Sequence, residues 1–421
     1  MDENRISIIG AGYVGLTTAL AFAEKGFKIN IYDIDSDKIK NINNGTSYYY
    51  EPRLDDLLTK HVNNGSLVTS PSLKSLLKST DIVFICVGTP TNDKGFIDLS
   101  FLEKVCIEIG DFLHSSNNYI TIIIKSTVVP TTTDTFVLNT IRDRSNKKLG
   151  KFGLGMVPEF LREGSAIEDA LNPDRIVIGY ELEDTKTLLT NLFSKWNCEK
   201  IFVNTRTAEI IKYTNNALLA LLISTANEIS NLTRQIGGID FSDIFDGIKH
   251  DRRWNTKDND SIYPDILKYF KPGPGFGGSC FPKDVKALLS FGEINDSKME
   301  ILRSIVSVNL RQHIEIKKIL VERSLLSKNN KLLILGLSFK ENTDDIRNSK
   351  SIELINLLYD KVELYAHDPL AIKNTISKLK DKNKINYIKD WKSILFKIDI
   401  VILMTNWNEY KSINLRDIKD T

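Results

Sequence analysis

The chain has 421 residues, 42% of them hydrophobic and 26% charged, which is typical of a water-soluble globular protein of two or three domains. Its 56 Lys and Arg against 54 Asp and Glu leave a net charge of +2, which excludes a strongly basic nucleic-acid-binding surface. No run of about 18 apolar residues occurs and the N-terminus is polar, so we expect neither a membrane span nor a signal peptide. These features predict a cytoplasmic enzyme that binds neither nucleic acid nor membranes.

The first 35 residues predict one βαβ unit. A β-branched strand (6–9) leads into a glycine turn, a helix (16–25) and a second strand (28–32) that ends at Asp33. Gly10, Gly12 and Gly15 occupy the turn between strand and helix, which is the context of a dinucleotide-binding fingerprint. Asp33 is expected to accept hydrogen bonds from the ribose hydroxyls and to favour NAD over NADP.

Two later apolar strands extend this α/β pattern. Segments 82–87 and 120–124 are separated by helix-length stretches, which predicts a parallel, doubly wound sheet. Thr89 and Thr127 lie just past these strands, at the edge where such sheets bind ligands. Taken alone, either threonine fits a plain turn hydroxyl equally well.

A long helix is predicted from about residue 208 to 236, without Pro or Gly. At 1.5 Å per residue it would span roughly 43 Å, so we interpret it as a spine between two domains and a possible dimer surface. Lys212 and Asn216 share one face of it at i and i+4 spacing. They are either site residues or the solvated edge of the helix.

Cys280 follows a glycine-rich loop (273–278) and precedes Pro282, a helix-start signal. A cysteine at a helix N-terminus beside Lys283 favours the thiolate, and thus nucleophilic chemistry, over a small buried residue. Cys86 and Cys106 fit a core role, and the absence of a CxxC spacing argues against a disulfide framework or a metal site. Because no histidine lies in these motifs, acid–base work falls to Glu159, Glu163, Lys212 or Asp284.

The α/β pattern restarts near residue 331 with strand 332–335, helix 352–358, strand 362–365 ending near Asp368, and strand 398–404. This second copy lacks the glycine triplet. The expected fold class is therefore α/β, with two Rossmann-like doubly wound domains joined by a long central helix. The expected division is an NAD-binding domain (1–206), a central helical region with the cysteine loop (207–325) and a C-terminal sugar-nucleotide domain (326–421). A polar loop is expected over 251–263.

Taken together, the motifs resemble the UDP-glucose/GDP-mannose dehydrogenase family. They are, in chain order, GAGYVGL, VGTP, KSTV, PEFLREGSAIEDALNPDRIVIG, GFGGSCFPKD and GLSFKENTDDIRNS. The resemblance implies NAD-dependent four-electron oxidation of a nucleotide sugar, most like UDP-glucose to UDP-glucuronate. The aldehyde would be held on the cysteine as a thiohemiacetal and then as a thioester. It also implies a homodimer and an outlet in polysaccharide biosynthesis.

The resemblance assigns site residues by position. The implied catalytic residues are Cys280, Lys212, Asp284, Glu163, Thr127, Asn216 and Glu159. The implied NAD-binding residues are Gly10, Gly12, Tyr13, Val14, Gly15, Asp33, Lys38, Thr89, Thr127, Glu163, Lys283 and Arg347. The implied substrate-binding residues are Phe160, Leu161, Lys212, Asn216, Arg253, Tyr269, Gly277 and Lys340.

Two departures from the family pattern stand out. About eleven extra residues follow Arg253, and a strand with an Arg that relatives usually carry is expected to be missing beyond residue 421. GDP-mannose and a UDP-N-acetylhexosamine are alternative substrates for the same mechanism. A two-electron hydroxyacid dehydrogenase, which needs no cysteine, and a non-enzymatic NAD-sensing protein are alternatives of other classes.

Overall fold

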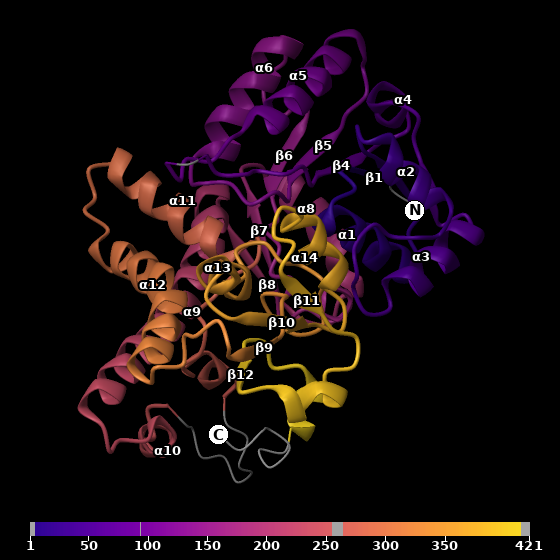
Figure 1. Cartoon of the computed structure of the whole chain (residues 1–421). Helices are drawn as coiled ribbons and strands as arrows, with labels where there is room; N and C mark the ends of the chain where they lie inside the picture. Colours follow the sequence, from indigo (N-terminus) through magenta and orange to yellow (C-terminus); the bar gives the residue numbers. More distant parts are fainter. Residues whose placement is uncertain (1–4, 93, 255–263, 414–421) are drawn as a thin grey trace. The chain divides into compact units, whose positions relative to one another are not determined.

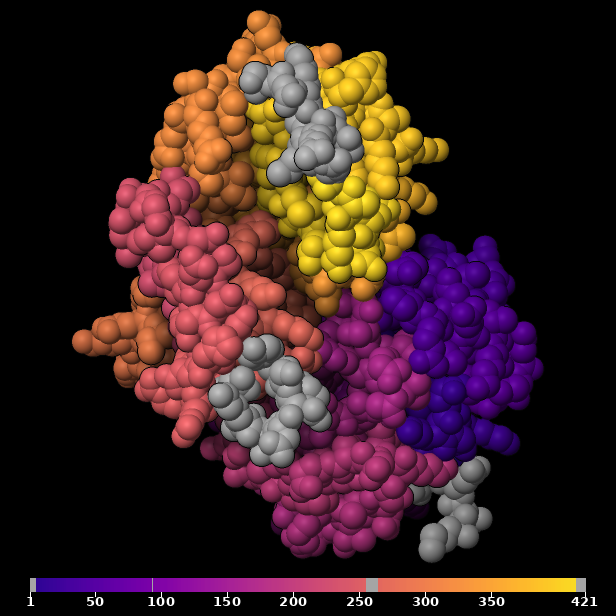
Figure 2. Space-filling view, turned by 90° about the horizontal axis from the view of Figure 1, so that it is seen from below, coloured from indigo at the N-terminus to yellow at the C-terminus, as the bar shows by residue number. Residues whose placement is uncertain are grey.

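The computed structural model describes residues 5–92, 94–254 and 264–413; the remaining residues are grey in Figures 1 and 2. The chain forms two compact units, Met1–Thr214 and Asn215–Thr421, which are described separately. Among the described residues, no helix is both long and apolar enough to cross a lipid bilayer.

The described part of the first unit is built on an eight-stranded sheet of order β3-β2-β1-β4-β5-β6-β7-β8. The first six positions repeat the strand order of a dinucleotide-binding fold, in which the order of strands reverses between the parallel neighbours β1 and β4. Only β6 and β7 pair antiparallel in this sheet, a detail that the sequence pattern does not predict. The strands are β1 (Ile6–Ile9), β2 (Ile29–Tyr32), β3 (Leu67–Thr69), β4 (Ile82–Ile85), β5 (Thr121–Ile124), β6 (Gly153–Met156), β7 (Arg175–Tyr180) and β8 (Glu199–Val203).

Helices cover both faces of this sheet (Figure 1). Because strand side chains alternate, Ile8 packs into the core beneath α1 and α3, whereas its neighbour Ile9 packs into the core beneath α4 and α5. The helical elements are α1 (Tyr13–Glu24), α2 (Ser36–Asn43), α3 (Leu54–Asn63), α4 (Leu73–Lys78), α5 (Ser100–Ser115), a π-helix (Thr132–Val137), α6 (Leu138–Ser145), α7 (Ala166–Leu171), α8 (Glu183–Leu192) and a 3₁₀ turn (Phe193–Lys195).

The predicted long helix is present as α9 (Thr205–Ile236), which begins in the first unit and continues into the second. Its start lies three residues before the predicted one. The expected fold class, with a Rossmann-like domain and a long central helix, is confirmed.

The described part of the second unit carries a four-stranded parallel sheet of order β11-β10-β9-β12. Its strands are β9 (Lys331–Leu335), β10 (Glu363–His367), β11 (Ile385–Tyr387) and β12 (Ile400–Leu403). Its helical elements are α10 (Phe241–Lys249), a 3₁₀ turn (Asp265–Tyr269), α11 (Phe281–Ile294), α12 (Glu300–Glu322), α13 (Lys350–Leu358), α14 (Ile372–Lys378) and two further 3₁₀ turns (Lys392–Lys397 and Asn408–Ser412). Residues 251–254 form a turn, and the rest of the expected 251–263 loop lies outside the described residues.

Asp368 follows β10 as Asp33 follows β2, but its carboxylate has a different environment. It is buried and accepts hydrogen bonds from the backbone N–H groups of Leu337, Ser338, Leu370 and Ala371. These bonds tie the end of β10 to the turn after β9. The second sheet thus repeats the Rossmann layout, with its acidic residue used to hold the backbone.

Glu209 on α9 is a buried carboxyl group inside the first unit. One of its oxygens accepts from the N–H of Thr133 at 2.8 Å and from the Thr133 hydroxyl at 2.6 Å. Burial raises the pKa of Glu209 to about 7, against these hydrogen bonds, which lower it. The folded state therefore keeps a proton that an unfolded chain releases above its ordinary glutamate pKa of about 4.3.

We expect this carboxyl group to make the first unit less stable as pH rises. Between about pH 4.3 and 7 the folded state binds the extra proton, so the free energy of unfolding falls as pH rises, by roughly 4 kcal/mol in total. Below that window the penalty is absent. Glu209→Gln should remove this slope and melt at a higher temperature than the wild type at pH 8. If the melting temperatures of the two proteins change with pH in the same way between pH 5 and 8, this account is contradicted.

Candidate active site

The glycine turn after β1 has the shape that a dinucleotide requires. Gly10 has φ +97°, and a Cβ there would lie 2.8 Å from the backbone carbonyl of Cys86. A Cβ on Gly15 would lie 1.8 Å from the carbonyl oxygen of Gly10. At Gly12, in contrast, a Cβ would meet no atom within 4 Å, so the missing side chain leaves open space at the helix start, where a pyrophosphate approaches.

Asp33 lies beside this turn and accepts a hydrogen bond from the N–H of Ala11 at 2.6 Å. The Lys38 ammonium is 3.6 Å from its carboxylate and also lies over the Tyr48 ring, 5.3 Å from the centroid. The Tyr48 hydroxyl donates to the carbonyl of Ala11 at 3.0 Å. Asp33, Lys38 and Tyr48 therefore border the glycine turn, and Tyr48 is a member that the sequence motifs do not indicate.

Thr89 and Thr127 join two loops at the strand ends. The Thr89 hydroxyl donates to the carbonyl of Thr127 at 2.7 Å, so it holds the backbone of the Thr127 loop. The same loop begins with Lys125, for which burial and the nearby Lys212 charge lower the pKa, while the Glu159 carboxylate opposes that shift. Lys125 is the first residue of the KSTV motif, but no role for it is predicted from the sequence.

Glu159 and Lys212 form an almost completely buried ion pair in the first unit. The Lys212 Nζ lies 2.9 Å from Glu159 Oε1, and the side chains are 3% and 5% exposed. The other Glu159 oxygen accepts from the N–H of Leu161 at 2.7 Å. Burial raises the pKa of Glu159, but the Lys212 ammonium, the Leu161 N–H and the charge of Lys125 together hold it below its usual value. Lys212 is thus buried and does not belong to a solvated edge of α9, while its role at the site stays a prediction.

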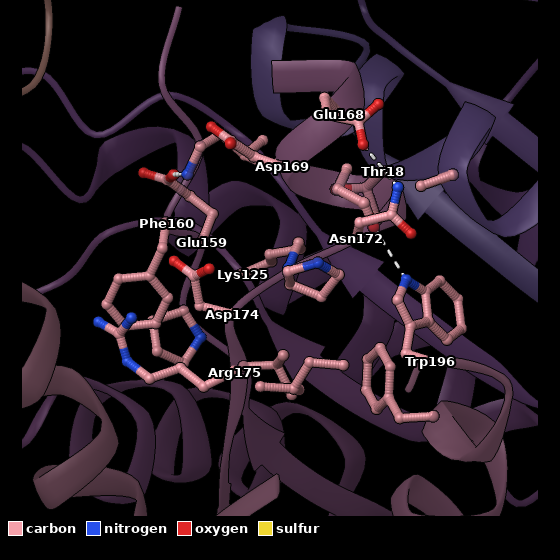
Figure 3. A pocket seen from close by; sticks show the side chains of 18 of the residues that line it. Thr18, Lys125, Glu159, Phe160, Glu168, Asp169, Asn172, Asp174, Arg175 and Trp196 are labelled. Carbon is pink, nitrogen blue, oxygen red and sulfur yellow. Dashed lines mark hydrogen bonds between the residues drawn. The ribbon is translucent and has the colours of Figure 1, made fainter. Parts of the chain in front are cut away.

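A cavity of about 190 Å³ opens beside this pair (Figure 3). Lys125, Glu159, Phe160, Leu161 and Arg175 are among its lining residues. The Arg175 guanidinium lies over the Phe160 ring, 4.2 Å from its centroid, and the Lys212 ammonium lies 5.4 Å from the same centroid. The predicted residues Glu159, Phe160 and Leu161 therefore meet at one hollow of the first unit.

In the second unit, Cys280 is the N-cap residue of α11, as the sequence predicts. Its side chain is half-buried, and its sulfur lies 3.6 Å from the Ser279 hydroxyl. By contrast, burial raises the pKa of Cys86 and of Cys106 to about 12. Those two sulfurs stay protonated thiols, as the sequence-based core role requires.

One turn into α11, Asp284 is buried and fully engaged with its neighbours. It accepts from the Asn216 side chain at 2.7 Å and from the Lys283 ammonium at 2.6 Å. The sequence predicts that Lys283 favours the Cys280 thiolate. In the structure the Lys283 ammonium forms an ion pair with Asp284, which the sequence does not predict. The structure thus brings Asn216 of α9 together with Lys283 and Asp284 of the cysteine motif.

The glycine loop before Cys280 is clamped by asparagine side chains from two helices. Asn309 of α12 accepts from the N–H of Phe276 at 2.8 Å and donates to its carbonyl at 3.0 Å. Asn227 of α9 accepts from the N–H of Gly273 at 2.7 Å. Neither asparagine belongs to a recognised motif. Each is distant in sequence from the loop residue that it contacts, so the local sequence gives no sign of the contact.

The GLSFKENTDDIRNS segment packs on the same loop. The N–H of Gly278 donates to the carbonyl of Arg347 at 2.8 Å, and the Asn348 side chain donates to the carbonyl of Gly278 at 2.9 Å. A Cβ on Gly277 would lie 2.6 Å from the Asn348 carbonyl oxygen, so only glycine fits there. Cys280 and the Arg347 segment are therefore joined through backbone contacts.

The remaining predicted side chains of the second unit lie at partly or fully exposed positions, whereas Glu163 of the first unit is buried. Arg347 pairs with Asp345 at 2.6 Å, and Lys340 is half-buried. Tyr269 faces the Phe281 ring at 6.3 Å between centroids. Arg253 pairs with Asp251, and its side chain is 86% exposed, so no described contact joins it to the other site residues. In the part of the chain that the structure describes, no cluster of three metal-ligating side chains occurs.

We expect Asn309→Ala to loosen the loop that carries Cys280. The change removes both hydrogen bonds to Phe276 and leaves buried backbone groups unpaired, at about 1–3 kcal/mol each. The melting temperature should fall, and iodoacetamide should alkylate Cys280 faster because the looser loop exposes the thiol. Gln312→Ala is the matched control, because Gln312 is equally buried on α12 but donates only within its own helix. Equal effects of the two changes would count against the clamp.

The chain is similar to known proteins over nearly its whole length. Models of the UDP-glucose/GDP-mannose dehydrogenase family match the chain over its NAD binding domain (4–197), central domain (206–311) and UDP binding domain (333–421). UDP-glucose 6-dehydrogenase TuaD of Bacillus subtilis is 34% identical over 418 residues, which cover 99% of this chain and 86% of that protein.

Two solved structures are also similar. A UDP-glucose dehydrogenase from Pyrobaculum islandicum matches with a TM-score of 0.89 at 33% identity, covering 98% of this chain and 92% of that one. A GDP-mannose dehydrogenase from Pseudomonas aeruginosa matches with a TM-score of 0.58 at 34% identity, covering 96% and 92%.

The chain belongs to the UDP-glucose/GDP-mannose dehydrogenase family. The expected enzyme class, an NAD-dependent nucleotide-sugar dehydrogenase, is thereby confirmed, as are its cofactor and its family. The roles of individual residues, the sugar and the domain boundaries stay predictions.

Proposed function

We propose that the protein oxidises C6 of UDP-glucose to the carboxylate of UDP-glucuronate. The observation that carries the proposal is Cys280 at the N-cap of α11, one turn before the buried Asp284. Two further features support it: the buried Glu159–Lys212 pair, and full-length similarity to proteins named UDP-glucose 6-dehydrogenase.

The first oxidation removes a hydride from C6 and a proton from its hydroxyl oxygen, and a water molecule takes the proton. NAD, when bound, accepts the hydride. Lys212 stabilises the oxygen as it gains negative charge, and Asn216, one turn further along α9, supports it with its amide. Glu159 holds the Lys212 ammonium in place from its other side.

The Cys280 thiolate then attacks the aldehyde carbon to form a thiohemiacetal. Its C6 keeps one hydrogen, which would leave as a hydride to a second NAD and convert the adduct to a thioester. Water, positioned by Thr127 and Asp284 and deprotonated by Glu163, attacks the thioester and releases the acid and the thiol. Two NADH therefore form for each acid.

The surrounding residues supply binding. We propose that the first of the three predicted parts binds NAD, the central part carries the thiol, and the third binds the sugar nucleotide. The proposed sugar-nucleotide contacts are Phe160, Leu161, Gly277, Tyr269, Lys340 and Arg253. The proposed cofactor contacts include the glycine turn with Tyr13 and Val14, Asp33, Lys38, Thr89, Lys283 and Arg347.

A panel of substrates tests this proposal. The purified protein with NAD and UDP-glucose should form two NADH per sugar, at a higher kcat/KM than with GDP-mannose or UDP-N-acetylglucosamine. A preference for GDP-mannose, which the Pseudomonas relative makes the second candidate, would correct the sugar and leave the chemistry intact. One NADH per molecule of a hydroxyacid, or NAD binding without turnover, would overturn the proposal.

We also propose that the protein is a homodimer through α9. Leu218, Leu232 and Ile236 are exposed and lie 14 and 4 residues apart, so they share one stripe of the helix. Exposed apolar stripes of this kind mark association surfaces. Light scattering should give twice the mass of the chain, and Leu232→Lys should shift it toward the monomer; a monomeric wild type would contradict the proposal.

A further inference from the structure

Glu51 is a buried carboxylate in the first unit that no motif indicates. It lies between α2 and α3, and its side chain is almost completely enclosed. One oxygen accepts from the Tyr13 hydroxyl at 2.8 Å and from the N–H of Gly164 at 2.7 Å. The other oxygen accepts from the N–H of Ala166, also at 2.7 Å.

These bonds connect two segments that the proposed chemistry uses. Tyr13 is the first residue of α1, inside the glycine fingerprint. Gly164 and Ala166 directly follow Glu163, and Gly164 adopts a left-handed φ of +82° that turns the chain there. Glu163 is itself buried, and its charge adds to the forces that raise the pKa of Tyr13.

Hydrogen bonds to a buried carboxylate are short and strong because one partner is charged. Two of the three donors are backbone groups, so Glu51 fixes the path of the chain just after Glu163. A base must lie within hydrogen-bond reach of the proton it removes, and misplacement by about 1 Å can cost roughly a hundredfold in rate.

We propose that Glu51 is a positioning residue that sets the Glu163 carboxylate for thioester hydrolysis and couples its placement to the cofactor turn. The proposal rests on the proposed function, in which Glu163 activates the water. Glu51 touches neither substrate nor reacting atoms, so its effect should appear in hydrolysis and not in the two hydride transfers.

Glu51→Gln tests this directly. The amide group cannot accept at both ends, so it loses at least one of the two backbone bonds. In stopped-flow with UDP-glucose and NAD, we expect a burst of two NADH per Cys280 at a rate within about threefold of the wild type. The steady-state rate should then fall about 10- to 100-fold, with KM for UDP-glucose little changed.

Arg53→Gln is the matched control. Arg53, two residues after Glu51, joins the same loop to α7 through a surface ion pair with Glu168 at 3.3 Å, and such exposed pairs contribute little. Its burst and steady state should equal those of the wild type. Glu51→Asp, which keeps the charge but shortens the reach, gives a second variant if Glu51→Gln does not fold.

The ratio of burst rate to steady-state rate decides the matter. The inference is overturned if this ratio in the Glu51 variants equals the wild-type value while burst amplitude and turnover fall in equal proportion. That result would show a merely structural role for Glu51. If the wild type itself forms no NADH from UDP-glucose, the proposed function fails first, so the two failures are distinguishable.

Discussion

Replacing Cys280 with alanine is expected to abolish formation of the sugar acid, with kcat/KM reduced at least about 10³-fold. Without the sulfur, the aldehyde has no covalent anchor and its carbon cannot present a second hydride as a thiohemiacetal. Any residual turnover should give one NADH per sugar and a C6 aldehyde. Product mass and NADH yield measure this outcome.

Cys198→Ala provides the control for that experiment. Cys198 is also half-buried, but it lies just before β8 in the first unit and has no place in the proposed chemistry. We expect its activity to match the wild type. Acid production by Cys280→Ala at two NADH per sugar would refute a covalent role for the thiol.

Replacing Lys212 with methionine should damage both chemistry and stability. The change removes the charge that stabilises the developing oxyanion, which predicts a loss of about 10²–10³-fold in kcat. It also leaves the Glu159 carboxylate buried without its ammonium partner, at a cost of about 3–5 kcal/mol. Glu159 should then titrate at a higher pH, so the stability lost should be partly regained as pH is lowered.

A double variant separates the two effects. Glu159→Gln combined with Lys212→Met removes both charges, so we expect most of the stability to return while activity stays lost. Lys186→Met on the surface of α8 serves as the control and should change neither. Full activity of Lys212→Met, or a double variant no more stable than the single one, would contradict the assigned role.

The sequence was sufficient for features that local spacing determines. The glycine turn, Asp33 after β2, the helix start at Cys280 and the long helix each depend on residues that are neighbours along the chain. The structure bears these elements out, and the family matches confirm the fold class and the cofactor. Individual residue roles at the site still await experiment.

The parts that sequence reading missed depend on contacts between distant segments. Glu51 and Gly164 are 113 residues apart, and Asn309 lies 33 residues beyond the loop that it holds. A single glutamate or asparagine has no periodic signature, so only the folded backbone reveals its partners. The antiparallel pairing of β6 and β7 is likewise set by chain path rather than by side-chain pattern.

The most direct test of the covalent account is to weigh the enzyme during turnover. In Glu163→Gln, where hydrolysis should be slow, acid quenching in the presence of UDP-glucose and NAD should yield a protein heavier by one UDP-glucuronyl group, located on Cys280 by peptide mapping. Two NADH per sugar with an unmodified Cys280, or an adduct on another residue, would contradict the account.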